Sequence, residues 1–244
     1  MDHADHVQHL RTQYAALRAA AVAAGPDAAV PTCPGWTVRD LLDHVGLTHS
    51  WALQALHTPV DGARPKPADR PSDWDELLDW CDKNLAELAD TLAYTTSNTP
   101  AWSFTGTKTF AFWSRRQAHE TAIHRLDAEH ARLGPDVPSL LFDVEFAADG
   151  VDEYLTVMLV HVARRKPIER AGRVLFHAAD ASRAWEVLLT PGLPPEVGPI
   201  TGSATDEDAT AAGTADALYR AAWGRPSGAI TSGDRSLLDG LPRP

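Results

Sequence analysis

Residues 113–132 read WSRRQAHETAIHRLDAEHAR. This stretch contains no glycine or proline and is rich in residues that favour helices, so we expect a helix of several turns. Residues three and four apart share one face of a helix. Four polar residues therefore form one line along it: Gln117, Glu120, His124 and Asp127. Small and apolar residues run beside this line and can be buried: Ala118, Ala122, Ile123 and Leu126.

Glu120 and His124 are one helical turn apart and can point at the same place. An acid and an imidazole beside a buried face suit a metal site or a proton-transfer site. Taken alone, the pair is more typical of a solvated surface pair. The zinc-protease pattern H-E-x-x-H is absent, since His119 and His124 are five residues apart. A functional site therefore needs a third ligand from another part of the chain.

Two earlier segments, residues 3–24 and 38–57, have the apolar periodicity of helices and are separated by a Pro-rich loop. Thr37 is the expected N-cap of the second helix, and Asp40 completes a capping box. His44 lies at the edge of the apolar stripe of this helix. A single histidine there is more often a hydrogen-bonded core residue, but His44 is the best placed of the chain's residues to supply the third ligand. His49, on a different face, is a weaker candidate.

A Pro-rich crossover, residues 58–71, leads to a third apolar stripe. We expect Ser72 to cap this helix, with Asp75 as its capping-box partner. Apolar residues alternate by four and three through the stripe, which places Cys81 as a small buried residue. With the helix at 113–132, these segments make four amphipathic helices joined by one long crossover. That pattern predicts a four-helix bundle.

The pattern changes in the last third of the chain. A helical run is expected over 139–165, with a break at Gly150. Short strands are expected at 173–178, 185–190 and 229–232, an Ala-rich helix at 211–223 and a last helical turn at 236–241. We therefore expect an α+β protein, with a helical bundle and connecting helix over 1–165 and a small α/β C-terminal domain over 166–244.

Charge and cysteine usage narrow the class of protein. The 244 residues include 22 Lys plus Arg against 33 Asp plus Glu, which gives a net charge of -11. An acidic chain without a basic patch argues against nucleic acid or an anionic membrane as a partner. The N-terminal sequence lacks the pattern of a signal peptide, and the two cysteines, Cys33 and Cys81, form no C-x-x-C pair. We expect a cytoplasmic protein with reduced thiols; the sequence does not indicate its oligomeric state.

Two segments carry a family resemblance: VPTCPGWTVRDLLDHV, residues 30–45, and WSRRQAHETAIHRLDAE, residues 113–129. They resemble the mycothiol-dependent maleylpyruvate isomerase family, a branch of the DinB-like bundles. The segments AADGVDEYL, residues 147–155, and WGRPSGAITSGD, residues 223–234, resemble its C-terminal domain. The resemblance implies a divalent metal, usually zinc, held by His44, Glu120 and His124. Asp40, Gln117 and Asp127 are then plausible partners of the ligands.

The resemblance also implies a reaction. A thiol on a divalent cation loses its proton near neutral pH and becomes a nucleophile. In the isomerase, the thiol of mycothiol would add to the cis double bond of maleylpyruvate, and rotation followed by elimination would give the trans isomer. Arg225 matches a family arginine that would hold a substrate carboxylate; otherwise it is a charge at a helix C-terminus.

Three alternatives stay open at this stage. The thiol could be transferred to another small electrophile, which would make the protein an S-transferase. The chain could be a non-catalytic, metal-containing protein that binds a small ligand. It could also be a metal-independent scaffold in which His44 is hydrogen-bonded in the core. Zinc suits the ligands, but iron, nickel and manganese also occupy such sets.

Overall fold

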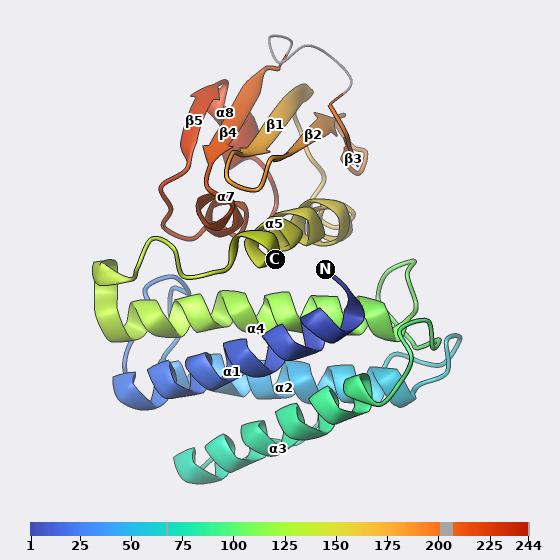
Figure 1. The fold of residues 1–244 in the computed structure, drawn as a ribbon, viewed down its shortest axis with the longest axis vertical. Helices are drawn as coiled ribbons and strands as arrows, with labels where there is room; N and C mark the ends of the chain where they lie inside the picture. The colour runs from blue at the N-terminus through green and yellow to red at the C-terminus, as the bar shows by residue number, and fades with distance from the viewer. Residues whose placement is uncertain (67, 201–206, 244) are drawn as a thin grey trace. The chain divides into compact units, whose positions relative to one another are not determined.

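The computed structural model describes residues 1–66, 68–200 and 207–243. The chain forms two compact units, Met1–Val137 and Pro138–Pro244. The first unit is helical, and the second combines helices with a sheet, as predicted for an α+β protein (Figure 1). Among the described residues, no helix is both long enough and apolar enough to cross a membrane.

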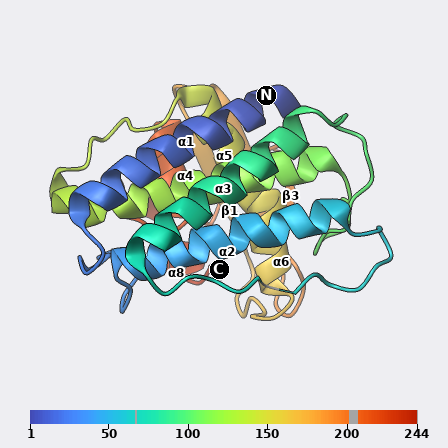
Figure 2. The same cartoon turned by 90° about the horizontal axis from the view of Figure 1, so that it is seen from below.

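The N-terminal unit is a bundle of four long helices, seen from below in Figure 2. They are α1(His3–Ala24), α2(Val38–His57), α3(Trp74–Ala93) and α4(Phe110–Leu133), followed by a 3₁₀ turn, η1(Gly134–Asp136). α1 packs mainly on α4, and α2 packs on both α3 and α4. The predicted four-helix bundle is confirmed, with the first two helices at the expected residues.

Apolar stripes of the four helices meet in the core of the bundle. Its fully buried leucines come from all four helices and include Leu10, Leu17, Leu41, Leu42, Leu88, Leu92 and Leu126. The apolar line predicted beside the polar line of α4 is buried as well: Ala118, Ala122, Ile123 and Leu126. Cys81 is buried as expected. The residues that flank the polar line of α4 are buried. The charged groups of that line therefore lie in an environment of low dielectric constant.

The N-caps of α2 and α3 test the capping predictions. Thr37 and Asp40 form the predicted capping box at the start of α2. At α3 the prediction of Ser72 is wrong, because Asp73 is the N-cap and its carboxylate accepts the backbone N–H groups of Asp75 and Glu76. An aspartate satisfies these N–H groups and also complements the positive end of the helix, so it caps at least as well as serine.

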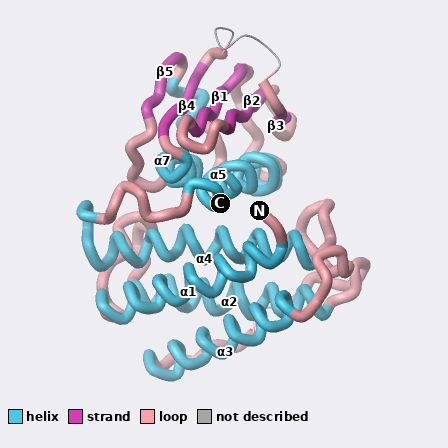
Figure 3. The backbone as a smooth tube through the Cα atoms, viewed as in Figure 1, coloured by secondary structure: helices cyan, strands magenta, loops and turns pink. Residues whose placement is uncertain are grey.

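The C-terminal unit carries one five-stranded sheet in the order β3-β2-β1-β4-β5, drawn in magenta in Figure 3. Only β1 and β4 pair in parallel; the other neighbours are antiparallel. Both α7 and α8 contact β1 and β4. The strands are β1(Gly172–Ala178), β2(Arg183–Leu189), β3(Glu196–Gly198), β4(Ala209–Gly213) and β5(Ile230–Gly233). The helices are α5(Val144–Glu153), a π-helical segment η2(Tyr154–Leu159), α6(Val160–Ala163), α7(Ala215–Ala222) and α8(Arg235–Asp239).

Two predictions for this unit are corrected. The Ala-rich segment 211–223 is not one helix: Ala209–Gly213 form β4, which pairs with β1, and the helix begins only after Thr214. Pairing within the sheet overrides the helix propensity of alanine. The sheet also contains the short strand β3, which was not among the expected strands. Gly150 does not break α5, which runs through it over Val144–Glu153. A Cβ at this position would approach the Tyr219 ring to 2.5 Å. The glycine thus serves close packing of two helices.

The division between the units also differs from the expected one after residue 165. It falls after Val137, so the helical run over 144–163 belongs to the C-terminal unit. Phe142 and Phe146 pack on Tyr219 of α7, with ring centroids 5.3 and 6.4 Å apart. These long-range aromatic contacts attach the run to the sheet-bearing unit, and the periodicity of the helix itself carries no information about them.

Candidate metal centre

Three predicted ligands lie together in the N-terminal unit. His44 comes from α2, and Glu120 and His124 come from α4. One ligand atom from each lies within 4.8 Å of the others. His44 Nε2 is 3.0 Å from Glu120 Oε1, and His124 Nε2 is 3.4 Å from the same oxygen. Two imidazole nitrogens thus converge on one carboxylate oxygen. The packing of α2 on α4 brings the third predicted ligand beside the two on α4.

The cluster is accessible from one side. The side chain of His44 is 40% exposed, whereas those of Glu120 and His124 are 14% and 10% exposed. The two α4 residues are therefore anchored in the bundle, and a small molecule can approach along the His44 side.

Asp127 forms a hydrogen bond with the ring nitrogen of His124 that does not face Glu120. Its Oδ2 lies 2.9 Å from His124 Nδ1, and the residue is fully buried. Thr32 Oγ1 donates to Oδ1 at 2.6 Å, and Cys33 Sγ donates to Oδ2 at 3.3 Å. A carboxylate on Nδ1 favours the tautomer with a proton there, which leaves Nε2 free to bind a metal. Asp127, one of the three expected partners of the predicted ligands, therefore orients His124.

The other two expected partners have different surroundings. Asp40 accepts hydrogen bonds from the backbone N–H and the hydroxyl of Thr37, so its carboxylate is used in capping α2. Gln117 is buried on α4, one turn before Glu120. Among the described residues its Oε1 has no hydrogen-bond partner, so this oxygen does not orient any of the predicted ligands.

Arg116 contacts Glu120, and the sequence analysis did not identify it as a site residue. Its Nη2 lies 2.8 Å from Glu120 Oε2, and only 4% of its side chain is exposed. Glu120 therefore uses one oxygen for the histidines and the other for a buried guanidinium. The spacing of Arg116 and Glu120, four residues on a helix, was the signal for this pair.

The loop before α2 covers the histidines. The Trp36 ring lies 5.1 Å from that of His44 and 6.2 Å from that of His124, nearly parallel to the latter. Backbone hydrogen bonds within the loop hold it in shape, including Val30 N–H to Trp36 O at 2.9 Å. Gly35, with φ of 87°, provides the left-handed residue that the turn needs. The segment PTCPGW thus supplies Thr32, Cys33 and Trp36 to the site.

The hydrogen bonds and charges around the cluster favour the ionised forms of Glu120 and His124. Burial alone would raise the pKa of Glu120, but hydrogen bonds with His124 and His44 and the charge of Arg116 hold that pKa well below its usual value. Burial alone would lower the pKa of His124, but hydrogen bonds to Asp127 and Glu120 outweigh it and raise the pKa to about 9. A cation binding here would therefore compete with a proton on His124.

His49 is a core residue outside this cluster. It is fully buried, and its Nε2 lies 2.8 Å from Thr121 Oγ1. Burial lowers its pKa to about 3, so the ring is neutral at physiological pH.

Arg225 belongs to the C-terminal unit, just after α7. Its Nη1 donates to Trp223 O at 2.7 Å, and it lines a cavity of about 360 Å³ with Arg235 and Arg243. Asp239 lies in the same lining and pairs with Arg235 at 3.6 Å. The three guanidinium groups make this cavity suited to an anion. A substrate contact by Arg225 stays a prediction.

The fold and the site together define a four-helix bundle that carries a His/Glu/His cluster, joined to a small α/β unit. Residues 7–129 match the family model described as the mycothiol maleylpyruvate isomerase N-terminal domain, and residues 145–240 match the MDMPI C-terminal domain. The chain therefore belongs to the mycothiol maleylpyruvate isomerase family.

Two solved structures have the same fold. One is the mycothiol-dependent maleylpyruvate isomerase, with a TM-score of 0.64 and 15% sequence identity. The other is a histidine-to-alanine mutant described by the same name, with a TM-score of 0.66 and 16% identity. Each comparison covers 100% of this chain and 96% of the other. None of the curated proteins matches the chain.

Proposed function

We propose that this protein is a metal- and mycothiol-dependent enzyme in which a thiolate attacks a small, carboxylate-bearing electrophile. The reaction is either cis–trans isomerisation of the maleylpyruvate type or transfer of the thiol. The convergence of His44, Glu120 and His124, in a member of this family, is the observation that carries the proposal.

The donor set fits a divalent metal. Two imidazole nitrogens and one carboxylate oxygen are the ligands of several catalytic zinc sites, and three protein ligands leave a position for a substrate. Both Nε2 atoms face Glu120 Oε1. Zinc is the metal we propose, because it binds this nitrogen and oxygen set well.

Bound here, a divalent cation would lower the pKa of a thiol so that the thiolate forms near neutral pH. The chain's own residues prepare this position. Asp127 orients His124, and Arg116 neutralises the second oxygen of Glu120. The Trp36 ring packs against both imidazoles. These contacts hold the ligands before any substrate arrives, which is how a site avoids reorganisation during the reaction.

The isomerisation conserves all atoms and electrons. The thiolate sulfur forms a bond to one carbon of the cis double bond, and the electron pair moves into the adjacent carbonyl group. Rotation about the new single bond follows. The electron pair then returns, the carbon–sulfur bond breaks, and the trans double bond and the thiolate are regenerated. Arg225 is our proposed anchor for a substrate carboxylate, because guanidinium binds carboxylate with two hydrogen bonds.

The first experiment is a calorimetric titration of the metal-loaded protein with mycothiol. We expect saturable binding that disappears in His124→Ala. If binding is absent even at a large excess of thiol, the mycothiol dependence is wrong, and a non-catalytic, metal-containing binding protein becomes the better account.

Product analysis then separates the two reactions. With maleylpyruvate as substrate, an isomerase gives fumarylpyruvate and leaves the amount of mycothiol unchanged. An S-transferase consumes mycothiol in proportion to product and gives a stable thioether.

A further inference from the structure

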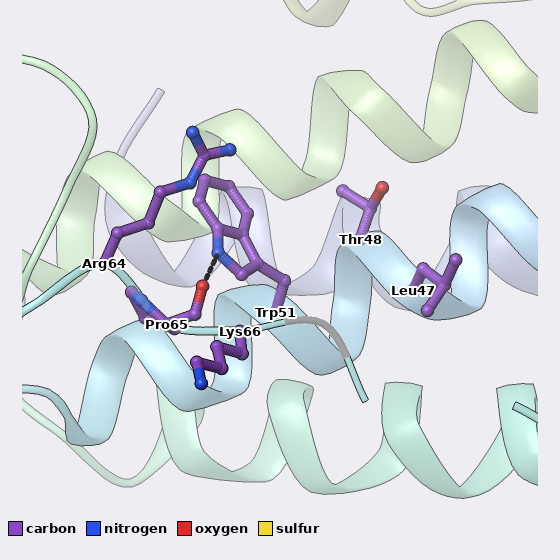
Figure 4. Close-up of a pocket in the computed structure, with 6 residues that line it drawn as sticks. All are labelled: Leu47, Thr48, Trp51, Arg64, Pro65 and Lys66. Atoms are coloured by element: carbon purple, nitrogen blue, oxygen red, sulfur yellow. Dashed lines mark hydrogen bonds between the residues drawn. The ribbon is translucent and has the colours of Figure 1, made fainter. Parts of the chain in front are cut away.

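A cavity of about 420 Å³ lies beside α2 in the N-terminal unit (Figure 4). One wall comes from α2 and the other from the crossover segment that follows it. Trp51 Nε1 donates to Pro65 O at 3.2 Å and so fastens the crossover to the helix. The lining residues are Leu47, Thr48, Trp51, Arg64, Pro65 and Lys66.

The part of the cavity wall that α2 supplies lies on the same face of the helix as His44. Thr48 and Trp51 follow His44 by four and seven residues, so all three lie on the same side of the helix. At 1.5 Å per residue, Thr48 is about 6 Å and Trp51 about 10 Å beyond His44 along the helix axis. Thr48 Oγ1 donates to His44 O at 2.9 Å. A small molecule of six to eight heavy atoms could therefore reach from this cavity towards the cluster.

The indole at the cavity is held in a fixed position. Three aromatic rings pack around Trp51 with centroid distances of 5.3 to 5.9 Å: Trp102, Phe104 and Trp113. The guanidinium of Arg64 lies over the indole, 5.4 Å from the ring centroid. The aromatic cluster thus places one cation at the edge of the cavity, where stacking holds it without using its N–H donors.

The surroundings of Arg64 favour an anion as the ligand. Within residues 1–66, 68–200 and 207–243, no carboxylate pairs with its guanidinium. The Thr48 hydroxyl already donates its proton to the carbonyl oxygen of His44. A ligand in the cavity would therefore take its hydrogen bonds from Arg64. A sugar ring would need the indole face that Arg64 covers, so the cavity suits a carboxylate better than the sugar part of a thiol cosubstrate. In a chain of net charge -11, a local cation is needed to attract an anion.

We propose that this cavity binds a carboxylate of the substrate through Arg64, while the reacting end of the molecule reaches His44, Glu120 and His124. This assignment rests on the proposed function and adds an anchor within the N-terminal unit. Lys66 has no part in it: in Figure 4 its ammonium lies on the opposite side of the Trp51–Pro65 hydrogen bond from the guanidinium.

The test is calorimetric binding of maleate, a small cis-dicarboxylate, to the metal-loaded full chain, with its neutral diamide as a comparison ligand. We expect Arg64→Gln to weaken maleate binding about tenfold, since a charge-assisted pair is lost. Arg64→Lys should restore part of the affinity. Lys66→Gln is the matched control and should leave it within about twofold, because surface charges away from the contact are screened. Both positions are exposed, so neither glutamine variant should alter folding.

Parallel titrations with mycothiol separate this proposal from the proposed function. Equal maleate binding by Arg64→Gln and the unchanged protein overturns the carboxylate anchor, even if mycothiol binds. Weaker mycothiol binding with unchanged maleate binding assigns the cavity to the thiol and also overturns it. A loss of maleate binding specific to Arg64→Gln supports the anchor, even if the protein fails to bind mycothiol.

Discussion

The imidazole of His124 is fixed by Asp127, whose Oδ2 lies 2.9 Å from Nδ1 at a fully buried position. This contact turns the other ring nitrogen towards Glu120 and His44. The geometry of the cluster therefore depends on a carboxylate that is not itself one of the three predicted ligands.

Removing any one of the three ligands should abolish tight metal binding. We expect His44→Ala, Glu120→Ala and His124→Ala each to lose bound metal while the helical circular dichroism spectrum is retained. His57→Ala, an exposed histidine on α2, is the matched control and should keep its metal. Elemental analysis of protein purified without a His tag checks this. Full metal in all three ligand variants would refute the site.

Asp127→Asn should weaken metal binding without removing a ligand. Loss of a carboxylate behind a ligating histidine typically costs about 10–100-fold in metal affinity. Competition with a chelator of known affinity measures the change. Asp136→Asn, at an exposed position after α4, is the control and should leave the affinity unchanged. An unaltered affinity in Asp127→Asn would show that the orientation of His124 is set elsewhere.

Arg116→Met should destabilise the bundle because it leaves the charge of Glu120 buried beside an apolar side chain. Breaking a buried ion pair on one side typically costs about 3–5 kcal/mol. Arg11→Met is a control in the same bundle: Arg11 pairs with Asp90 at 2.7 Å, and the two side chains are 40% and 59% exposed. Such a pair contributes at most about 1 kcal/mol. Urea unfolding of both variants measures the difference, and similar losses would argue against a special role for Arg116.

The buried His49 should make the protein less stable in mild acid. Its pKa is about 3 in the folded chain and about 6.5 in the unfolded one, so below pH 6.5 the unfolded state binds the extra proton. The contribution of His49 to stability is complete above pH 6.5 and falls as pH drops towards 3. Between pH 6 and 5 the loss is about 1 kcal/mol.

Replacing His49 isolates this effect from the other titrating groups. Urea unfolding at pH 7, 6 and 5 should show a shallower loss of stability in His49→Gln than in the unchanged protein. Equal slopes would mean that His49 takes up its proton over the same pH range in the folded and the unfolded state.

Helix positions and their faces were largely readable from the sequence. The spacing of Glu120 and His124 placed them one turn apart, and Thr37 with Asp40 marked the start of α2 within one residue. These features are local, because a helix face repeats every three to four residues and a cap is decided by a few neighbours. The loop that covers the histidines was harder to predict. Nothing in the sequence PTCPGW indicates that Thr32 and Cys33 contact Asp127, which is 94 or 95 residues away.

Periodicity and capping residues were enough to predict the helical bundle and the polar line on α4, and the family resemblance added His44 to the predicted ligands. The packing of the elements in space brings His44 to 3.0 Å from Glu120 and places Asp127 and Arg116 against the two α4 residues. It also divides the Ala-rich segment into β4 and α7. The two kinds of feature depend on interactions that act over different separations along the chain. Periodicity and capping act within a few residues, whereas convergence of side chains and pairing of strands depend on which elements pack together, and that is set by the burial of the whole core.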